Sequence, residues 1–145
     1  MGYYIRRIIT GPAPTLAQIE AGARAKDEDV TFESSGDASA HILMIGDAAG
    51  EIDVTCKGED LFEAEIEELL EDLDGTEGNA LAKVTETLNS ATCIVAVRVL
   101  FGGRDTDEVL DDLAPVLDWL SETCTGLTQA DDEGYYDGHD LILEI

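Results

Sequence analysis

Short runs of apolar and β-branched residues recur along the chain and predict strands. Residues 3–9 are aromatic and β-branched, and residues 92–101 carry an apolar side chain at every second position. Residues 52–56 alternate between apolar and polar side chains, as in a sheet with one face toward water. The pattern predicts seven strands, at residues 3–9, 30–33, 41–45, 52–56, 92–101, 127–129 and 141–144.

Longer segments place their apolar residues at the spacing of an amphipathic helix. One such stripe runs from Phe62 to Leu73 and includes Ile66, Leu69 and Leu70. Asp60 stands where a cap would begin this helix. Thr15, followed by Gln18 three positions later, matches a capping box at the start of another helix. The spacing predicts four helices, one after Thr15 and the others over about residues 60–73, 79–89 and 106–123.

These elements predict one α+β domain over residues 1–145, a mixed and mostly antiparallel sheet of about seven strands with about four helices packed on it. Residues 41–45 and 52–56 predict a β-hairpin whose loop is residues 46–51. That loop places Ile45 opposite Ile52 and His41 opposite Cys56. A Cys–His pair can form a nucleophile. We interpret His41 as the rim of the core, because no orienting carboxylate accompanies the pair.

The charge is strongly acidic, with 33 acidic residues, 8 basic residues and a net charge of −25. Such a chain repels the phosphates of DNA and RNA, so we expect no direct binding of nucleic acid. The acidity has three explanations: adaptation to concentrated salt, docking of a basic partner, or solubility. The longest apolar run is too short to span a membrane, and the first residues lack a signal-peptide core. We therefore expect a cytoplasmic protein that does not enter membranes.

Three cysteines, Cys56, Cys93 and Cys124, lie far apart in the sequence and form no CxxC motif. An odd number at such spacing argues against a disulfide framework and against a structural zinc site. We expect reduced thiols, as is usual in the cytoplasm.

The segment Asp72-Leu73-Asp74-Gly75-Thr76 has the form DxDGT. It resembles the first motif of the haloacid dehalogenase-type phosphatases, which implies a nucleophilic first aspartate, a second aspartate that handles the leaving-group proton, and bound Mg²⁺. In that family the motif ends a buried strand near the N-terminus, whereas here it follows a helical stripe in the middle of the chain. We interpret Gly75 as the glycine that ends a helix.

The segment QADDEGYYDGHD, residues 129–140, gathers carboxylates, two tyrosines and a histidine. Oxygen ligands suit Ca²⁺ or Mg²⁺, but the spacing does not match an EF-hand, so a metal at this segment stays an open question. Tyrosines among acids are also typical of contact patches, and in a last hairpin Tyr135 and Tyr136 would face opposite sides of the sheet. The candidate partner-binding residues are Asp131, Asp132, Glu133, Tyr135, Tyr136, Asp137 and His139.

We therefore expect a non-enzymatic interaction protein, with no cofactor and no catalytic residue, whose acidic surface binds a basic protein. An immunity-type inhibitor of a cationic toxin and a mimic of DNA charge both fit this description. One alternative is a small-ligand or divalent-cation enzyme with a site near the C-terminal acidic loop. A second alternative is a salt-adapted domain whose charge carries no information about partners. The sequence leaves the oligomeric state open.

Overall fold

The computed structural model describes residues 4–100, 105–124, 126–131 and 133–144. Within them lie eight strands: β1 (Tyr4–Thr10), β2 (Val30–Gly36), β3 (Ser39–Met44), β4 (Asp47–Cys56), β5 (Cys93–Val99), β6 (Leu127–Ala130), β7 (Gly134–Asp137) and β8 (Asp140–Glu144). The four helices are α1 (Leu16–Lys26), α2 (Asp60–Glu71), α3 (Leu81–Ser90) and α4 (Thr106–Thr123). The predicted α+β fold and its four helices are confirmed, and the sheet has one strand more than predicted.

The strands form one open sheet in the order β2-β3-β4-β5-β1-β6-β7-β8. Every pairing among the described strands is antiparallel, so the sheet is not mixed. The strand that the sequence pattern missed is β7, which lies inside the segment taken for an acidic loop. The predicted central strand is confirmed, because β5 pairs with β4 on one side and with β1 on the other.

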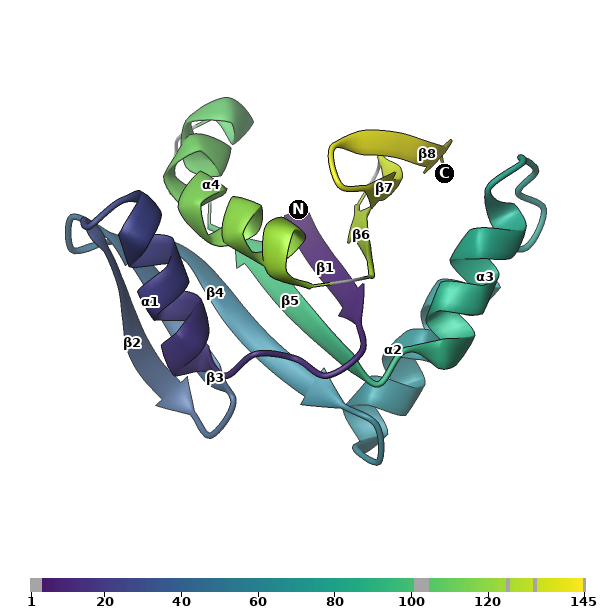
Figure 1. Ribbon diagram of the computed structural model, residues 1–145, viewed down its shortest axis with the longest axis horizontal. Helices are drawn as coiled ribbons and strands as arrows, with labels where there is room; N and C mark the ends of the chain where they lie inside the picture. Colours follow the sequence, from purple (N-terminus) through teal and green to yellow (C-terminus); the bar gives the residue numbers. More distant parts are fainter. Residues whose placement is uncertain (1–3, 101–104, 125, 132, 145) are drawn as a thin grey trace.

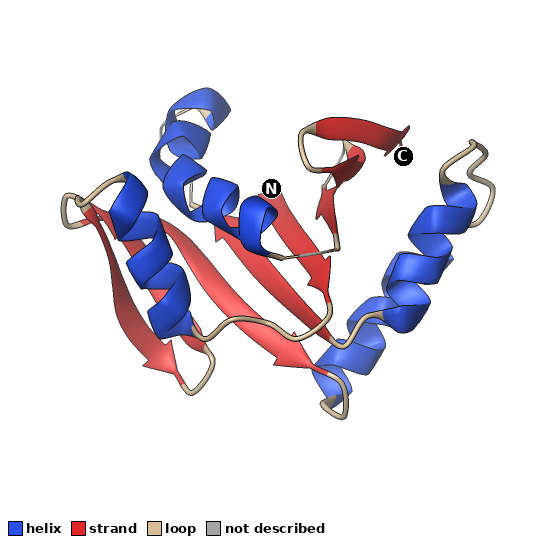
Figure 2. Ribbon diagram, in the orientation of Figure 1, coloured by secondary structure: helices blue, strands red, loops and turns tan. Residues whose placement is uncertain are grey.

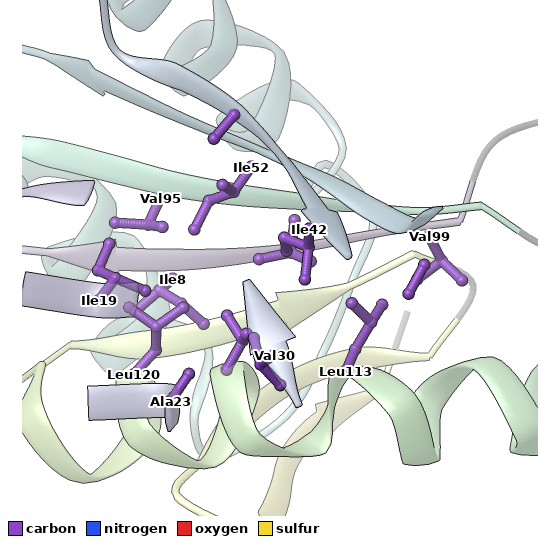
Figure 3. Packing of buried hydrophobic residues seen from close by; sticks show 14 of the residues in the cluster. Ile8, Ile19, Ala23, Val30, Ile42, Ile52, Val95, Val99, Leu113 and Leu120 are labelled. Atoms are coloured by element: carbon purple, nitrogen blue, oxygen red, sulfur yellow. The ribbon is translucent and has the colours of Figure 1, made fainter. Parts of the chain in front are cut away.

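Helices cover both faces of the sheet, in two separate pairs (Figures 1 and 2). On one face α1 and α4 pack against each other and over strands β1 to β5. Figure 3 shows this core, in which Ile19 of α1 and Leu113 and Leu120 of α4 meet Ile42, Ile52 and Val95 of the sheet. On the other face α2 and α3 bury Ile9, Ile94, Leu127, Tyr135 and Leu143. Consecutive residues such as Ile8 and Ile9 therefore belong to different cores.

Helix boundaries follow the local signals closely. The capping box before α1 is present: the Gln18 amide donates to Thr15 Oγ1 at 3.1 Å, and the Thr15 amide donates to Gln18 Oε1 at 2.9 Å. Helix α2 begins one residue earlier than predicted, with Glu59 rather than Asp60 as its N-cap. Within the described parts of the chain, no helix has both the length and the apolar character needed to cross a bilayer.

The β3–β4 hairpin has a shorter turn than predicted. Ile45 and Gly46 turn the chain with φ values of 53° and 82°, as in a two-residue hairpin turn of type I′. Residues 47–51, predicted as loop, belong to β4. The predicted register is therefore wrong: His41 lies opposite Glu51, and Ile42 opposite Gly50. Sequence reasoning missed the turn because a β-branched residue such as Ile45 rarely takes positive φ.

Cys56 and Cys93 form a disulfide between β4 and β5. The expectation of three reduced thiols is wrong, because the pairing register places these two cysteines directly opposite each other, with their Cα atoms 4.0 Å apart. Cys124 remains a free thiol at the end of α4. Its burial raises the pKa of the thiol above the ordinary value.

Candidate functional site

The predicted C-terminal segment does not form one patch, because its side chains divide between the two faces of the sheet. Asp131 lies on the α2 side, where its Oδ1 forms an ion pair with Arg7 Nη1 at 3.0 Å. The Gln129 amide donates to the same carboxylate at 3.3 Å, and so does the backbone amide of Ile5. The Asp131 carboxylate therefore already has three partners inside the protein.

Glu133 and Tyr136 meet on the opposite side, beneath α4. The Tyr136 hydroxyl donates to Glu133 Oε1 at 2.6 Å, and Arg6 Nη2 lies 3.6 Å from Glu133 Oε2. The Arg6 guanidinium also lies over the Tyr136 ring, 6.0 Å from its centroid. The hydrogen bond to Glu133 raises the pKa of Tyr136, and burial lowers the pKa of Arg6. These contacts join Glu133 and Tyr136 to Arg6 of β1.

The remaining candidates have separate environments. Tyr135 is buried in the α2–α3 core, and this burial raises its pKa to about 12. Asp137 forms an exposed ion pair with Lys83 of α3 at 2.6 Å. His139 is exposed beside a small cavity of about 120 Å³ under α4. Asp132 lies outside the described residues.

Two sequence hypotheses about chemistry can be compared with this geometry. The DxDGT segment lies at a helix end, as interpreted: α2 stops at Glu71, Asp72 is its C-cap, and Gly75 has a φ of 83°. Neither Asp72 nor Asp74 ends a strand, which is where the phosphatase resemblance would place its aspartates. In the portion of the chain that the structure covers, no three His, Cys, Asp or Glu side chains gather into a group able to hold a metal.

Helix α2 also carries a dense run of acidic residues, which sequence reasoning did not single out as a surface. Residues 59–74 contain nine acidic residues and no basic one: Glu59, Asp60, Glu63, Glu65, Glu67, Glu68, Glu71, Asp72 and Asp74. On the outer side of the helix, partly buried Ile66 and Leu70 and four acidic residues line a shallow groove of about 490 Å³. We call this surface the α2 acidic face; its residues are Glu63, Ile66, Glu67, Leu70, Glu71 and Asp74.

The charges of α2 act against its own stability. Glu63, Glu67 and Glu71 follow one another at intervals of four, where like charges repel across one turn. The last turn carries acidic residues and no basic one, although the helix dipole favours cations there. Among the described side chains, the ion pairs of α2 involve Glu65, which binds Arg7. Among the described residues, no basic side chain forms an ion pair with a carboxylate of the α2 acidic face, which is thus a surface of concentrated negative charge.

Arg7 connects this helix to the C-terminal segment. Its Nε binds Glu65 of α2, and its Nη1 donates to Gln129 Oε1 at 2.7 Å and to Asp131 at 3.0 Å. The three acceptors come from α2 and from β6 and the residue that follows it, so one guanidinium fixes the helix to the strand. Burial opposes the charge of Arg7, but Glu65 and Asp131 favour it, and the pKa of Arg7 is raised overall.

A second hollow lies between α2 and the part of the same sheet face that α2 and α3 leave uncovered. Its volume is about 470 Å³, and strands β1, β4 and β5, the β2–β3 turn and the start of α2 surround it. Ala96 and Ile5 lie among the charged side chains of Arg7, Arg98, Asp53 and Glu65. We call this hollow the sheet groove. A sequence signal for it exists in the alternation of β4 and β5, where Asp53 and Arg98 stand at positions opposite in direction to the core residues.

Comparisons with known proteins found no matching protein-family model, no matching curated protein and no matching solved structure.

Proposed function

We propose that this protein is a non-enzymatic interaction module that binds a basic protein through the α2 acidic face. The observation that carries the proposal is the run of acidic residues on α2, in which Glu63, Glu67 and Glu71 repel one another at intervals of four and the last turn carries negative charge at the negative end of the helix dipole. A cationic partner relieves both the repulsion within the helix and the unfavourable interaction with the dipole. Partly buried Ile66 and Leu70 between the acids supply apolar contact area beside the charge.

The C-terminal candidates already have basic partners inside the protein. Asp131 shares the guanidinium of Arg7 with Glu65, and Asp137 forms an ion pair with Lys83. The proposal therefore rests on the α2 acidic face. A basic protein steered by the field of a chain with net charge −25 would associate rapidly at low salt. Inhibition of a cationic toxin and mimicry of DNA charge are two functions that use such a surface.

A capture experiment with matched variants tests the proposal. The immobilised protein is incubated with lysate at low salt, and a retained basic protein is identified and its affinity measured against salt. The test variant replaces Glu63, Glu67 and Glu71 with Gln. The control variant replaces Glu28, Asp111 and Asp118, which lie exposed on or near α1 and α4, with Gln or Asn, for the same change in net charge.

The proposal expects the α2 variant to bind at least tenfold more weakly than the control variant. Equal losses in both variants would show that only the total charge matters. The salt-adapted alternative has its own signature, a steep rise of melting temperature between about 0.05 and 2 M sodium chloride. A nearly flat melting temperature over that range would argue against salt adaptation and favour a partner as the reason for the acidity.

The compartment forms part of the same proposal. A cytoplasmic setting follows from the sequence expectation, yet stable disulfides are rare in reducing compartments, and Cys56 and Cys93 are bonded. Rapid acid quenching of cells followed by alkylation would report the state of these cysteines. Free Cys56 and Cys93 in the cell would favour the cytoplasm, and a fully oxidised pair would favour an oxidising compartment.

A further inference from the structure

The sheet groove differs from the α2 acidic face because two guanidiniums, those of Arg7 and Arg98, line it together with carboxylates and apolar side chains. We propose that it binds a small organic cation: an amine, amidine or guanidine on a short apolar body. The proposal concerns a different surface from the partner-binding face and does not depend on it.

The groove exists because a small residue interrupts a row of long ones. Along one row of the sheet, Ser39, Asp53, Ala96, Arg7 and Gln129 lie opposite one another on neighbouring strands. Ala96 has a single methyl group between two charged neighbours, so the row has a dip at β5. The hollow of about 470 Å³ is in the size range of small-molecule sites.

The floor and one wall of the groove are apolar. Ile5 lies next to Ala96 on the same face, one row along β1, and Leu61 stands on the wall formed by α2. Leu61 is 72% exposed and therefore open to contact from a ligand. A flat apolar body in the groove would cover this leucine and the Ala96 methyl together.

The charges in the groove favour a cation. Arg7 is held by Glu65, Gln129 and Asp131, and Arg98 Nη1 lies 3.0 Å from Glu51 Oε2, so both guanidiniums already bind carboxylates. The lining contains four carboxylates, those of Asp37, Asp53, Glu59 and Glu65, against these two guanidiniums. An anion would therefore have to displace internal carboxylates.

Asp53 is the acceptor best placed for the ligand. Its Oδ1 accepts a hydrogen bond from the Ser39 hydroxyl, which fixes the carboxylate above the Ala96 floor. No ion pair of Asp53 occurs among the described residues, since the described ion pairs involve other carboxylates. A charge-assisted hydrogen bond to Asp53 with an apolar body over Ala96 uses both features of the groove at once.

Three probes of the same shape and different charge test this inference. Benzamidine, benzyl alcohol and benzoate are titrated into the full chain, with affinity from calorimetry and location from amide chemical shifts. Benzamidine should bind and shift the signals of Ala96, Asp53 and Leu61, while benzyl alcohol and benzoate bind at least tenfold more weakly. Stronger binding of benzoate would overturn the inference and assign the groove to anions through its arginines.

Two variants decide whether the binding is local. Asp53→Asn keeps the shape and an acceptor for Ser39 but removes the charge, and it should weaken benzamidine at least tenfold. Ala96→Leu fills the floor and should abolish binding. The matched control is Asp29→Asn, an exposed aspartate before β2, which should change nothing. Unchanged affinity in Asp53→Asn, or an equal loss in Asp29→Asn, would show diffuse attraction to an acidic protein and overturn the site.

Discussion

The two faces of the sheet share the same strands, yet the described residues buried beneath α1 and α4 include no charged side chain, whereas α2 and α3 share their face with a charged surface. In the α1–α4 core the buried side chains of the sheet are isoleucine, valine and alanine. On the other face, the same strands β1, β4 and β5 present Arg7, Asp53 and Arg98 beside α2, around the sheet groove.

The difference follows from helix coverage and from the two-residue period of a strand. Each strand must present apolar side chains where a helix pair excludes water and polar ones where it does not. On β1, Ile9 lies under α3 and is fully buried, while Arg7, two residues earlier on the same face, contacts α2 through its charge. On the same face of β1, the side chain changes from a buried isoleucine to a charged arginine within two residues.

The sharpest test of the comparison uses two adjacent residues of β4. Ile52→Ala should destabilise the protein by about 2–5 kcal/mol, because it opens a cavity in the fully buried α1–α4 core. Asp53→Ala, one residue later on the open face, should stay within about 0.5 kcal/mol. Urea unfolding of both variants measures the difference. Similar losses would show that the open face contributes as much stability as the covered one.

The disulfide tests how firmly the strands beneath both faces are joined. Cys56→Ser together with Cys93→Ser should lower the free energy of unfolding by about 2–4 kcal/mol, because the bond closes a long loop in the unfolded chain. Thiol titration of the unreduced protein in denaturant should find one reactive thiol, that of Cys124. Three reactive thiols would contradict the bond.

Tyr135 reports on the α2–α3 core through alkaline pH. Burial raises its pKa to about 12, while an unfolded tyrosine titrates near pH 10. Between these values the unfolded state releases the proton and the folded state keeps it, so stability falls as pH rises, by up to about 3 kcal/mol. Denaturant unfolding from pH 9 to 12 should show this fall, and Tyr135→Phe should reduce it. If Tyr135→Phe left the fall of stability with pH unchanged, Tyr135 would not be the group whose raised pKa causes that fall.

On the charged face of the sheet, the Arg7 guanidinium joins α2 to β6 and the residue that follows it. Arg7→Met should cost about 1–3 kcal/mol, because Glu65 and Asp131 lose their shared cation in a half-buried site. Arg98→Met should cost less, about 0–1 kcal/mol, because the Arg98 side chain is 38% exposed against 17% for Arg7. Equal losses of stability would show that the half-buried ion pairs of Arg7 contribute no more than the more exposed pair of Arg98 and Glu51.

The smallest effect concerns the α2 acidic face. Glu71→Gln should stabilise the protein by about 0.3–0.5 kcal/mol at low salt, because it removes a like charge near Glu67 and near the negative end of the helix. Glu63→Gln, in the first turn, should not stabilise, since a carboxylate there suits the dipole. Both differences should shrink in 1 M sodium chloride. Equal effects at the two ends would argue that repulsion, and not the dipole, dominates.

Local order was predictable from the sequence because its causes lie within a few residues of each other. The capping box of Thr15 and Gln18 joins groups three residues apart, and the helical stripes repeat within one element. The alternation of residues 93–99 predicted the central strand from a pattern within one element. These features specified the α+β class, the four helices and seven of the strands.

The candidate site was less predictable, because it depends on residues that are distant in the sequence. Asp131, Glu133, Tyr135 and Tyr136 were named from composition, but the pleat sends them to opposite faces of the sheet. Strand β7 was hidden because Gly134-Tyr135-Tyr136-Asp137 is short and surrounded by acids. The register of β3 and β4 depends on a positive φ at Ile45, which cannot be predicted because isoleucine rarely adopts it.

By itself, the sequence determined the four helices, seven of the eight described strands, the acidity and the alternation within most strands. Only the tertiary structure decided which sides are covered and which side chains meet. Cys56 and Cys93 are 37 positions apart, and Arg7 reaches carboxylates 58 and 124 positions away. Periodicity is a local property of the chain, whereas register and helix coverage come from packing the whole sheet at once. The choice of Cys56 and Cys93 as partners, the contacts of Arg7 and the sheet groove are therefore decided by the tertiary fold.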